Sequence, residues 1–257
     1  AFICGTSTVT FTYNGNQVTY GTVVSAGGKC WLDRNLGASQ VATSSMDEAA
    51  YGDLFQWGRG ADGHQIRNPL SGTTSTLSGT DSPGHGLFIT TDSGNYDWRS
   101  TQNDNLWQGV NGVNNPCPTG FRVPTITELE NENQYWTSNN SVGAFASPLK
   151  LTLAGRRNYS SGSLDNENFS GGYWSSTPSS THSGLLFFNN TFASIGSTVR
   201  AFAYPIRCIQ DENSLPTGSI GSLNCAGANI TGTLTSGVPA SGISSAVPYT
   251  GGNGGTH

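Results

Sequence analysis

The stretch 171–211 constrains the fold of this chain more than any other. It holds three short aromatic and aliphatic runs, at 171–177, 184–190 and 200–209, separated by Ser, Thr, Gly and Asn. This is the pattern of strands joined by turns. The side chains of 185–188 (Leu, Leu, Phe, Phe) make both faces of the middle run apolar, which is typical of a central strand covered on both sides. We therefore expect three antiparallel core strands here.

Composition favours a loop-rich, mostly β protein with an ordered core. Charged residues are 11% of the chain, below the roughly 25% of ordinary globular domains, and Gly numbers 35. Six Trp, nine Tyr and eleven Phe supply core side chains, which argues against disorder. The net charge of -5 argues against a nucleic-acid partner. No run approaches the ~18 apolar residues of a membrane span, and no signal peptide precedes Ala1, so we expect a mature product or a piece of a longer chain.

The five cysteines predict disulfides and not a metal site. No pair has the two-residue spacing of a zinc ligand set. Two disulfides and one leftover cysteine fit an exported protein. Five cysteines taken as two pairs allow 5 × 3 = 15 arrangements. We favour Cys4–Cys30 near the N-terminal hairpin and Cys117–Cys208 across the core, which leaves Cys225 unpaired.

The N-terminal third carries a strong hairpin signal. Apolar and polar residues alternate over 8–24, and Asn14-Gly15 interrupts them at the centre, where a tight turn is expected. A short buried strand follows at 30–32, and a later apolar run predicts another strand at 149–153.

Two segments predict helices. Residues 44–58 have Ser caps, acidic residues in the first turn and an apolar face, although Gly52 weakens the pattern. The second helix begins at Thr125, which forms a capping box with Glu128, and it places Leu129 and Trp136 near one face.

Residues 58–115 show little periodicity and much Gly, Ser, Thr, Asn and Asp. A loop of this length without its own elements is unusual and tends to be functional. Its polar and aromatic residues concentrate at 95–99 and 103–107, where we place the candidate site. The predicted ligand-binding residues are Trp98, Arg99, Asn103, Asn105 and Trp107.

A change of composition after Asp211 predicts a domain boundary. Residues 213–257 hold no aromatic residue except Tyr249 and are dominated by Gly, Ser, Thr and Ala. We assign 1–212 to one domain and 213–257 to a linker or the first strands of a following β-repeat.

Five motifs in order resemble the Fibrobacter succinogenes major paralogous domain, a family of exported bacterial surface modules. They are the segments 30–36, 51–57, 117–124, 173–177 and 206–209, which read CWLDRNL, YGDLFQW, CPTGFRVP, YWSST and IRCI. The resemblance covers roughly 1–211. It implies an α+β, C-type-lectin-like fold: a small twisted antiparallel sheet, two flanking helices and a long loop region, stapled by disulfides. That fold also serves sugar-binding lectins, adhesin tips and formylglycine-generating enzymes, so it does not decide function.

The loop cluster has two interpretations. Asp97, Asn103 and Asp104 offer the oxygen ligands that calcium prefers, and Trp98 or Trp107 could then stack on a sugar ring bound at the ion. Alternatively, the Asp and Asn side chains cap turns and both Trp side chains anchor the loop to the core, which we favour as regards direct sugar contact. The Glu-Pro-Asn or Gln-Pro-Asp tripeptide of calcium-dependent lectins is absent.

Enzyme signatures find no support in the sequence. The four His are scattered, no Gly-x-Ser-x-Gly elbow is present, and the glycine-rich run 57–64 lacks the strand-to-helix context of a phosphate loop. We interpret that run as a turn held by Arg59 and Asp62. Arg156 and Arg157 could bind anionic glycans, but surface salt bridges are the better interpretation.

We therefore expect a non-enzymatic, extracellular binding or adhesion module of a bacterial surface protein. It would present loops 58–115 to a glycan or a surface-protein ligand, with calcium as a structural ion, and it would belong to a longer multi-module chain. The alternative is a stalk or cap unit that self-assembles in a filament or repeat array and has no ligand of its own.

Overall fold

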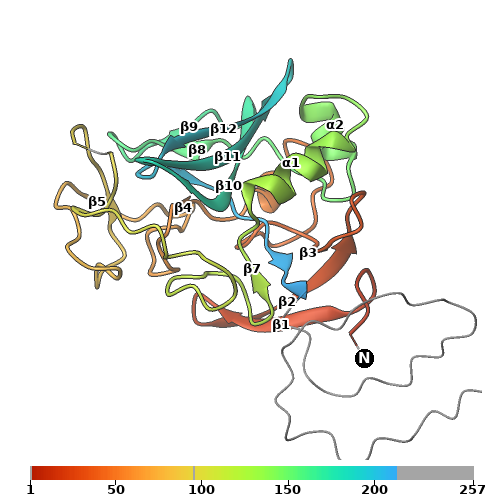
Figure 1. Ribbon diagram of the computed structural model, residues 1–257, viewed down its shortest axis with the longest axis horizontal. Coiled ribbons are helices and arrows are strands. Elements are labelled where there is room, and N and C mark those ends of the chain that lie inside the picture. Colours follow the sequence, from red (N-terminus) through yellow and green to blue (C-terminus); the bar gives the residue numbers. More distant parts are fainter. Residues whose placement is uncertain (1, 95, 213–257) are drawn as a thin grey trace, which may run out of the picture. The chain divides into compact units, whose positions relative to one another are not determined.

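The computed structural model describes residues 2–94 and 96–212, so Cys225 and the predicted linker 213–257 lie outside the described residues. The fold is mostly β, with a curled antiparallel sheet, two short helices and two disulfides (Figure 1). The helices are α1 (Ile126–Gln134) and α2 (Ser141–Ala146). None of the described helices is long and apolar enough to cross a membrane.

Four sheets organise the described residues. The five-stranded sheet has the order β1-β2-β3-β14-β7, the curled three-stranded sheet β10-β11-β12, and the four-stranded sheet β4-β13-β8-β9, while β5 and β6 form a parallel pair. The strand bounds are β1 (Thr8–Tyr13), β2 (Asn16–Val24), β3 (Cys30–Leu32), β4 (Phe55–Gln56), β5 (Thr73–Thr74), β6 (Phe88–Ile89), β7 (Phe121–Arg122), β8 (Arg156–Arg157), β9 (Leu164–Asp165), β10 (Ser170–Ser179), β11 (His182–Asn189), β12 (Ala193–Val199), β13 (Ala203–Tyr204) and β14 (Ile209–Gln210).

The predicted hairpin is confirmed. Strands β1 and β2 pair from Thr8↔Gly21 to Tyr13↔Asn16, with Asn14 and Gly15 between them. Both turn residues have positive φ, 48° and 76°, which is the conformation that a two-residue hairpin turn matching the strand twist requires.

The predicted three-strand core is correct for its first two strands and wrong for the third. Strand β11 lies between β10 and β12, and the side chains of Leu186 and Phe188 are fully buried. The third strand is β12, which the sequence did not indicate because its outer face is exposed and carries Ser, Gly and Thr. The apolar run 200–209 instead supplies β13 and part of β14, two short strands in other sheets.

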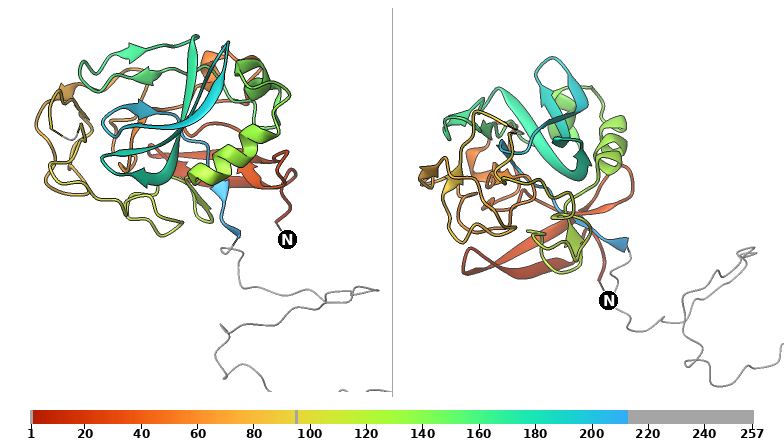
Figure 2. Two further views of the ribbon diagram at one scale, coloured as in Figure 1. Left: turned by 45° about the horizontal axis from the view of Figure 1, so that its top comes forward. Right: turned by 60° about the vertical axis from the view of Figure 1, so that its left-hand side comes forward.

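Helix α1 has the predicted capping box. The Thr125 side chain accepts from the Glu128 backbone N–H, and the Glu128 side chain accepts from the Thr125 backbone N–H. The helix packs on β10, β11 and β12, with Leu129 in the interface (Figure 2). Helix α2, which was not predicted, starts at Asn140, whose side chain accepts from the N–H groups of Val142 and Gly143.

Two predicted elements are wrong. Over 44–58 the predicted helix is replaced by a 3-10 turn, η1 (Glu48–Ala50), followed by strand β4. Gly52 has a φ of 69°, which ends the helical path, and a Cβ there would lie 2.6 Å from the Leu36 carbonyl oxygen. The run 149–153 is buried except for Lys150, but it forms no ladder, since the N–H of Leu151 bonds Ala144 and that of Leu153 bonds Ser45.

Both predicted disulfides are confirmed. Cys4 and Cys30 have Cα atoms 5.8 Å apart, and Cys117 and Cys208 have Cα atoms 5.9 Å apart. The second bond links the chain before β7 to the residue preceding β14, two strands that are neighbours in the five-stranded sheet.

Candidate functional site

The two tryptophans expected to contact a ligand are core residues. Trp98 and Trp107 each have 0% of their surface exposed. The Trp98 indole N–H donates to the Trp57 carbonyl at 2.7 Å, and the Trp107 ring lies 5.6 Å from the Trp57 ring. The expectation that either ring stacks on a sugar is therefore wrong. Both side chains anchor the 58–115 loops to the core instead.

The predicted calcium ligands are engaged by protein groups. Arg200 donates to Asp104 at 2.5 Å and lies 3.9 Å from the carboxylate of Asp97, so one guanidinium supplies positive charge to both acids. Asn103 donates its amide to Asp81 at 3.0 Å. Burial raises the pKa of Asp97, and the Arg99 N–H and the Arg200 charge lower it in part. Within 2–94 and 96–212, no group of three or more His, Cys, Asp or Glu side chains is placed to hold a metal ion.

The remaining predicted ligand residues form local contacts. Arg99 is ion-paired with Asp81. The Asn103 side-chain oxygen accepts from the Asn105 N–H at 3.0 Å, an Asx turn of the kind that was the alternative interpretation. The loop region thus holds itself together through its own polar side chains.

The predicted surface salt bridge is confirmed for Arg156 and wrong for Arg157, which is buried and bonds neutral oxygens. Arg156 forms an ion pair with Asp165 at 2.9 Å. Arg157 is buried and donates to the carbonyls of Gly162 and Ser71 at 2.6 Å each, so it is not available at the surface for an anionic glycan. The predicted turn contact between Arg59 and Asp62, at 2.7 Å, is confirmed.

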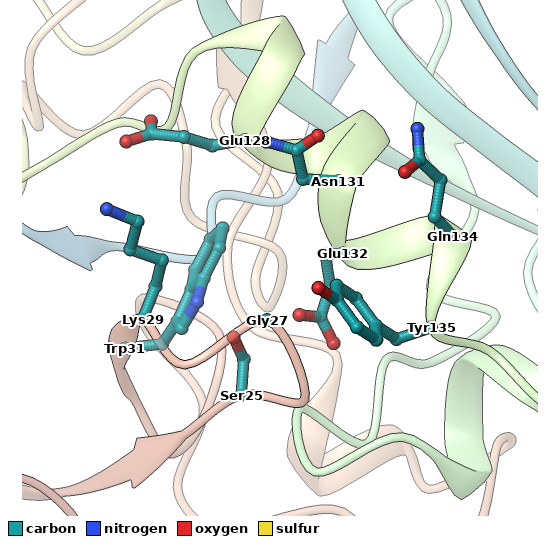
Figure 3. Close-up of a pocket in the computed structure, with 9 residues that line it drawn as sticks. All are labelled: Ser25, Gly27, Lys29, Trp31, Glu128, Asn131, Glu132, Gln134 and Tyr135. Atoms are coloured by element: carbon teal, nitrogen blue, oxygen red, sulfur yellow. The ribbon is translucent and has the colours of Figure 1, made fainter.

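A hollow beside α1, away from the predicted loops, has the features of a binding site. We call it the α1 pocket; its volume is about 210 Å³. Residues Ser25, Gly27 and Lys29 of the β2–β3 connection line one side, with Trp31 of β3, and one face of α1 lines the other (Figure 3). In Figure 1 the part of the 58–115 region around β5 lies at the left of the domain and α1 at the right.

Helical spacing explains which α1 side chains reach the pocket. Glu128, Asn131, Glu132 and Tyr135 stand at i, i+3, i+4 and i+7, which lie on one face of a helix. Glu128 is fixed by its place in the capping box and by two hydrogen bonds of 2.8 Å from Arg122. Burial opposes ionisation of Glu128, but these donors hold its pKa below the ordinary value.

Glu132 differs from Glu128 in having no such partners. It is only 2% exposed, and neither carboxylate oxygen has a hydrogen bond of normal geometry. Burial raises the pKa of Glu132, and the nearby Ser25 hydroxyl and Gly27 N–H offset that rise in part. Buried polar groups normally have partners, so a carboxylate left without one at a pocket wall indicates a group that awaits a ligand or a solvent molecule.

Trp31 adds an unpaired donor to the same hollow. The side chain is 1% exposed and its indole N–H has no acceptor. Its backbone is fixed at the centre of a sheet, since Trp31 pairs with Val23 of β2 and with Ile209 of β14. Two residues that line the α1 pocket, Glu132 and Trp31, therefore carry an acceptor and a donor that the described protein does not satisfy.

Tyr135 forms an exposed wall of the α1 pocket. It is 57% exposed, and a Cβ at position 27 would lie 3.3 Å from its ring. Gly27 thus lets the ring lie close to the β2–β3 connection. Lys29 stands at the rim, where its amine pairs with Glu212 at 2.6 Å.

A larger hollow of about 530 Å³ beside Arg67 is less suited to a ligand. The Arg67 guanidinium is already bound, to the Gly52 carbonyl at 2.9 Å, the Ala154 carbonyl at 2.8 Å and Glu167 at 2.6 Å. A ligand there would compete with bonds that the fold already makes.

Sequence reasoning missed the α1 pocket, although one signal was present. Leu129 and Trp136 define the buried face of the predicted helix, and Glu132 stands between them at helical spacing. Glu132 is unusual in that pattern, because it places a carboxylate on an otherwise apolar helix face. The position of Trp31 against it depends on sheet pairing and carries no local signal.

Comparison with known proteins adds no relative. No family model, no curated protein and no solved structure matches the chain. The resemblance to the major paralogous domain family stays a prediction.

The raised pKa of Glu132 predicts a pH-dependent stability. The folded state holds this proton to higher pH than the unfolded chain, so its contribution to stability falls as pH rises above the ordinary value of 4.5. Glu132→Gln should therefore raise the free energy of unfolding at pH 8 by about 1 to 3 kcal/mol and have little effect at pH 4. Denaturant unfolding at both pH values measures this. Glu130→Gln, an exposed change on the same helix, is the control; equal pH profiles for both variants would contradict the prediction.

Proposed function

We propose that the chain is a non-enzymatic, extracellular binding module of a bacterial surface protein, with the C-type-lectin-like fold of the major paralogous domain family. Its ligand site is the α1 pocket and not the 58–115 loops. The ligand is a glycan or a segment of a surface protein, of which one small group enters the pocket.

The fold and the location rest on several features together. The domain has a curled antiparallel sheet, two short helices and two disulfides, and disulfides persist in oxidising, extracellular environments. The ordered motifs of the sequence agree with an exported surface module.

The observation that carries the proposed site is the unpartnered Glu132 carboxylate. Glu132 lines a hollow whose wall also includes Trp31, which has an unpaired indole N–H, and the exposed ring of Tyr135. A concave site with a few convergent polar groups and an aromatic wall is the usual form of a small-ligand site. Glu128 is held in its ion pair, so Glu132 is the carboxylate of the α1 pocket that lacks a hydrogen-bond partner, and one such group suits binding better than acid–base chemistry.

An array of immobilised glycans and peptides tests this proposal. Tyr135→Ala removes the exposed wall of the α1 pocket and should weaken capture by about tenfold, the effect of losing an aromatic contact. Phe169→Ala is the matched control, since Phe169 is 76% exposed and does not line the pocket. Equal losses for the two variants, or none for either, would refute the α1 pocket as the site.

The alternative role, a stalk or cap unit, is favoured by the sheet edges. Strand β1 ends the five-stranded sheet and β12 ends the three-stranded sheet, and edge strands can pair with a second chain. Growth of particle mass with protein concentration, together with no capture on the array, would favour that role.

A further inference from the structure

We propose that the α1 pocket receives a primary ammonium group and that the Glu132 carboxylate is its counter-ion. This inference rests on the proposed function, because it names the chemical class of the group that the proposed site takes.

The Glu132 carboxylate lacks a positively charged partner in direct contact. An ionised carboxylate that is buried requires a positive partner or several donors. The cations around Glu132 are bound elsewhere: Lys29 pairs with Glu212, and Arg207 donates to Asn35 and to the Leu149 carbonyl. Figure 3 shows the Lys29 amine on the far side of Trp31 from the Glu132 carboxylate. The charge of Arg207 acts on Glu132 without a hydrogen bond between them, and a ligand ammonium would supply a positive group bonded directly to the carboxylate.

The side chains that line the α1 pocket suit an ammonium group. The rings of Trp31 and Tyr135 border the α1 pocket, and aromatic rings attract ammonium groups and cover the methylene or ring carbons attached to them. The amides of Asn131 and Gln134 stand at the helix side, where they can bond hydroxyl or carbonyl groups of the same ligand.

The volume of the α1 pocket and the net charge of the chain suit a small cationic group. A volume of about 210 Å³ is below the roughly 300 Å³ at which pockets for drug-sized ligands begin, so it suits one amino sugar or one lysine side chain. The net charge of -5 also favours the approach of cations. Both sources carry the same ammonium chemistry, and the experiment distinguishes them.

The test is calorimetric titration of the full chain with four probes. Glucosamine and Nα-acetyl-lysine methyl ester carry the ammonium; N-acetylglucosamine and Nα-acetyl-norleucine methyl ester are their neutral counterparts. We expect at least one amine to bind about tenfold or more tightly than its neutral counterpart, the effect of a charge-assisted hydrogen bond. Preference for glucosamine indicates an amino sugar as the natural group, and preference for the lysine ester indicates a protein ligand.

Variants complete the design. Glu132→Gln keeps the shape of the side chain and removes its charge, so it should abolish the tenfold preference for the amine. Glu130→Gln makes the same charge change on the exposed side of α1 and should leave that preference intact. Equal binding of amines and neutral probes, absence of amine binding, or an unchanged preference in Glu132→Gln would overturn the inference. Capture of neutral ligands on the array that depends on Tyr135 would then still support the proposed function. If there were neither amine preference nor Tyr135-dependent capture, the inference and the proposed function would both be rejected.

Discussion

Replacing Trp98 with alanine should lower the free energy of unfolding by about 3 to 5 kcal/mol, the range for removing a large aromatic side chain from a packed core. The indole is fully buried with Ile89 and Leu106, and its N–H bonds the Trp57 carbonyl at 2.7 Å. The variant leaves a cavity and removes the donor from that carbonyl. Urea unfolding followed by circular dichroism measures the loss.

Tyr135→Ala is the control for this experiment, because it removes an aromatic ring that is 57% exposed. It should cost less than about 1 kcal/mol, as surface substitutions usually do. If Trp98→Ala left stability unchanged and weakened ligand capture, Trp98 would belong to a surface site, and its place in the core would be wrong.

Breaking the Cys117–Cys208 bond should also lower the free energy of unfolding by a large amount. The bond closes a loop of 91 residues, and the chain-entropy relation gives about 4 to 5 kcal/mol for a loop of that length. The Cys4–Cys30 bond closes only 26 residues, for which the same relation gives about 3.5 kcal/mol. The longer bond also joins the segments that carry β7 and β14, so its removal frees two neighbouring strands.

Paired Cys→Ser variants measure this difference directly. The Cys117/Cys208 variant should show the lower denaturation midpoint of the two in urea at constant pH. The reverse order would mean that the N-terminal bond constrains more of the domain than its loop length implies.

The features that the sequence predicts correctly are those set by neighbours in the chain. The hairpin depends on two adjacent residues, Asn14 and Gly15, and the start of α1 depends on the spacing of Thr125 and Glu128. The disulfides are an exception: they join residues 26 and 91 positions apart, and the preferred pairing agrees with the structure.

The wrong predictions share a cause in tertiary contacts. The segment 44–58 has a helical composition, but Gly52 places its backbone against Leu36 and ends the turn. The run 149–153 has strand residues, but its N–H groups bond Ala144 of α2 and Ser45 instead of a neighbouring strand. Local propensity is overridden where the partner lies far away in the chain.

The burial of the two predicted ligand-binding tryptophans has a similar cause. Trp98 and Trp107 stand among polar loop residues in the sequence, which resembles an exposed patch, but the loops fold back and bury both rings. The Glu132 carboxylate becomes buried at a pocket only when Trp31 and the β2–β3 connection lie against α1. Exposure and the lack of a partner are properties of the folded domain.

The indole N–H signals of the six tryptophans test the central claim most directly. They can be followed by two-dimensional nitrogen–proton NMR while the tightest ligand from the array is added to the labelled full chain. If the α1 pocket is the site, the Trp31 signal shifts, because Trp31 lines the pocket, while the signals of Trp98 and Trp107, which do not line it, stay in place. Shifts of Trp98 or Trp107 with a stationary Trp31 would return the site to the 58–115 loops and contradict the account.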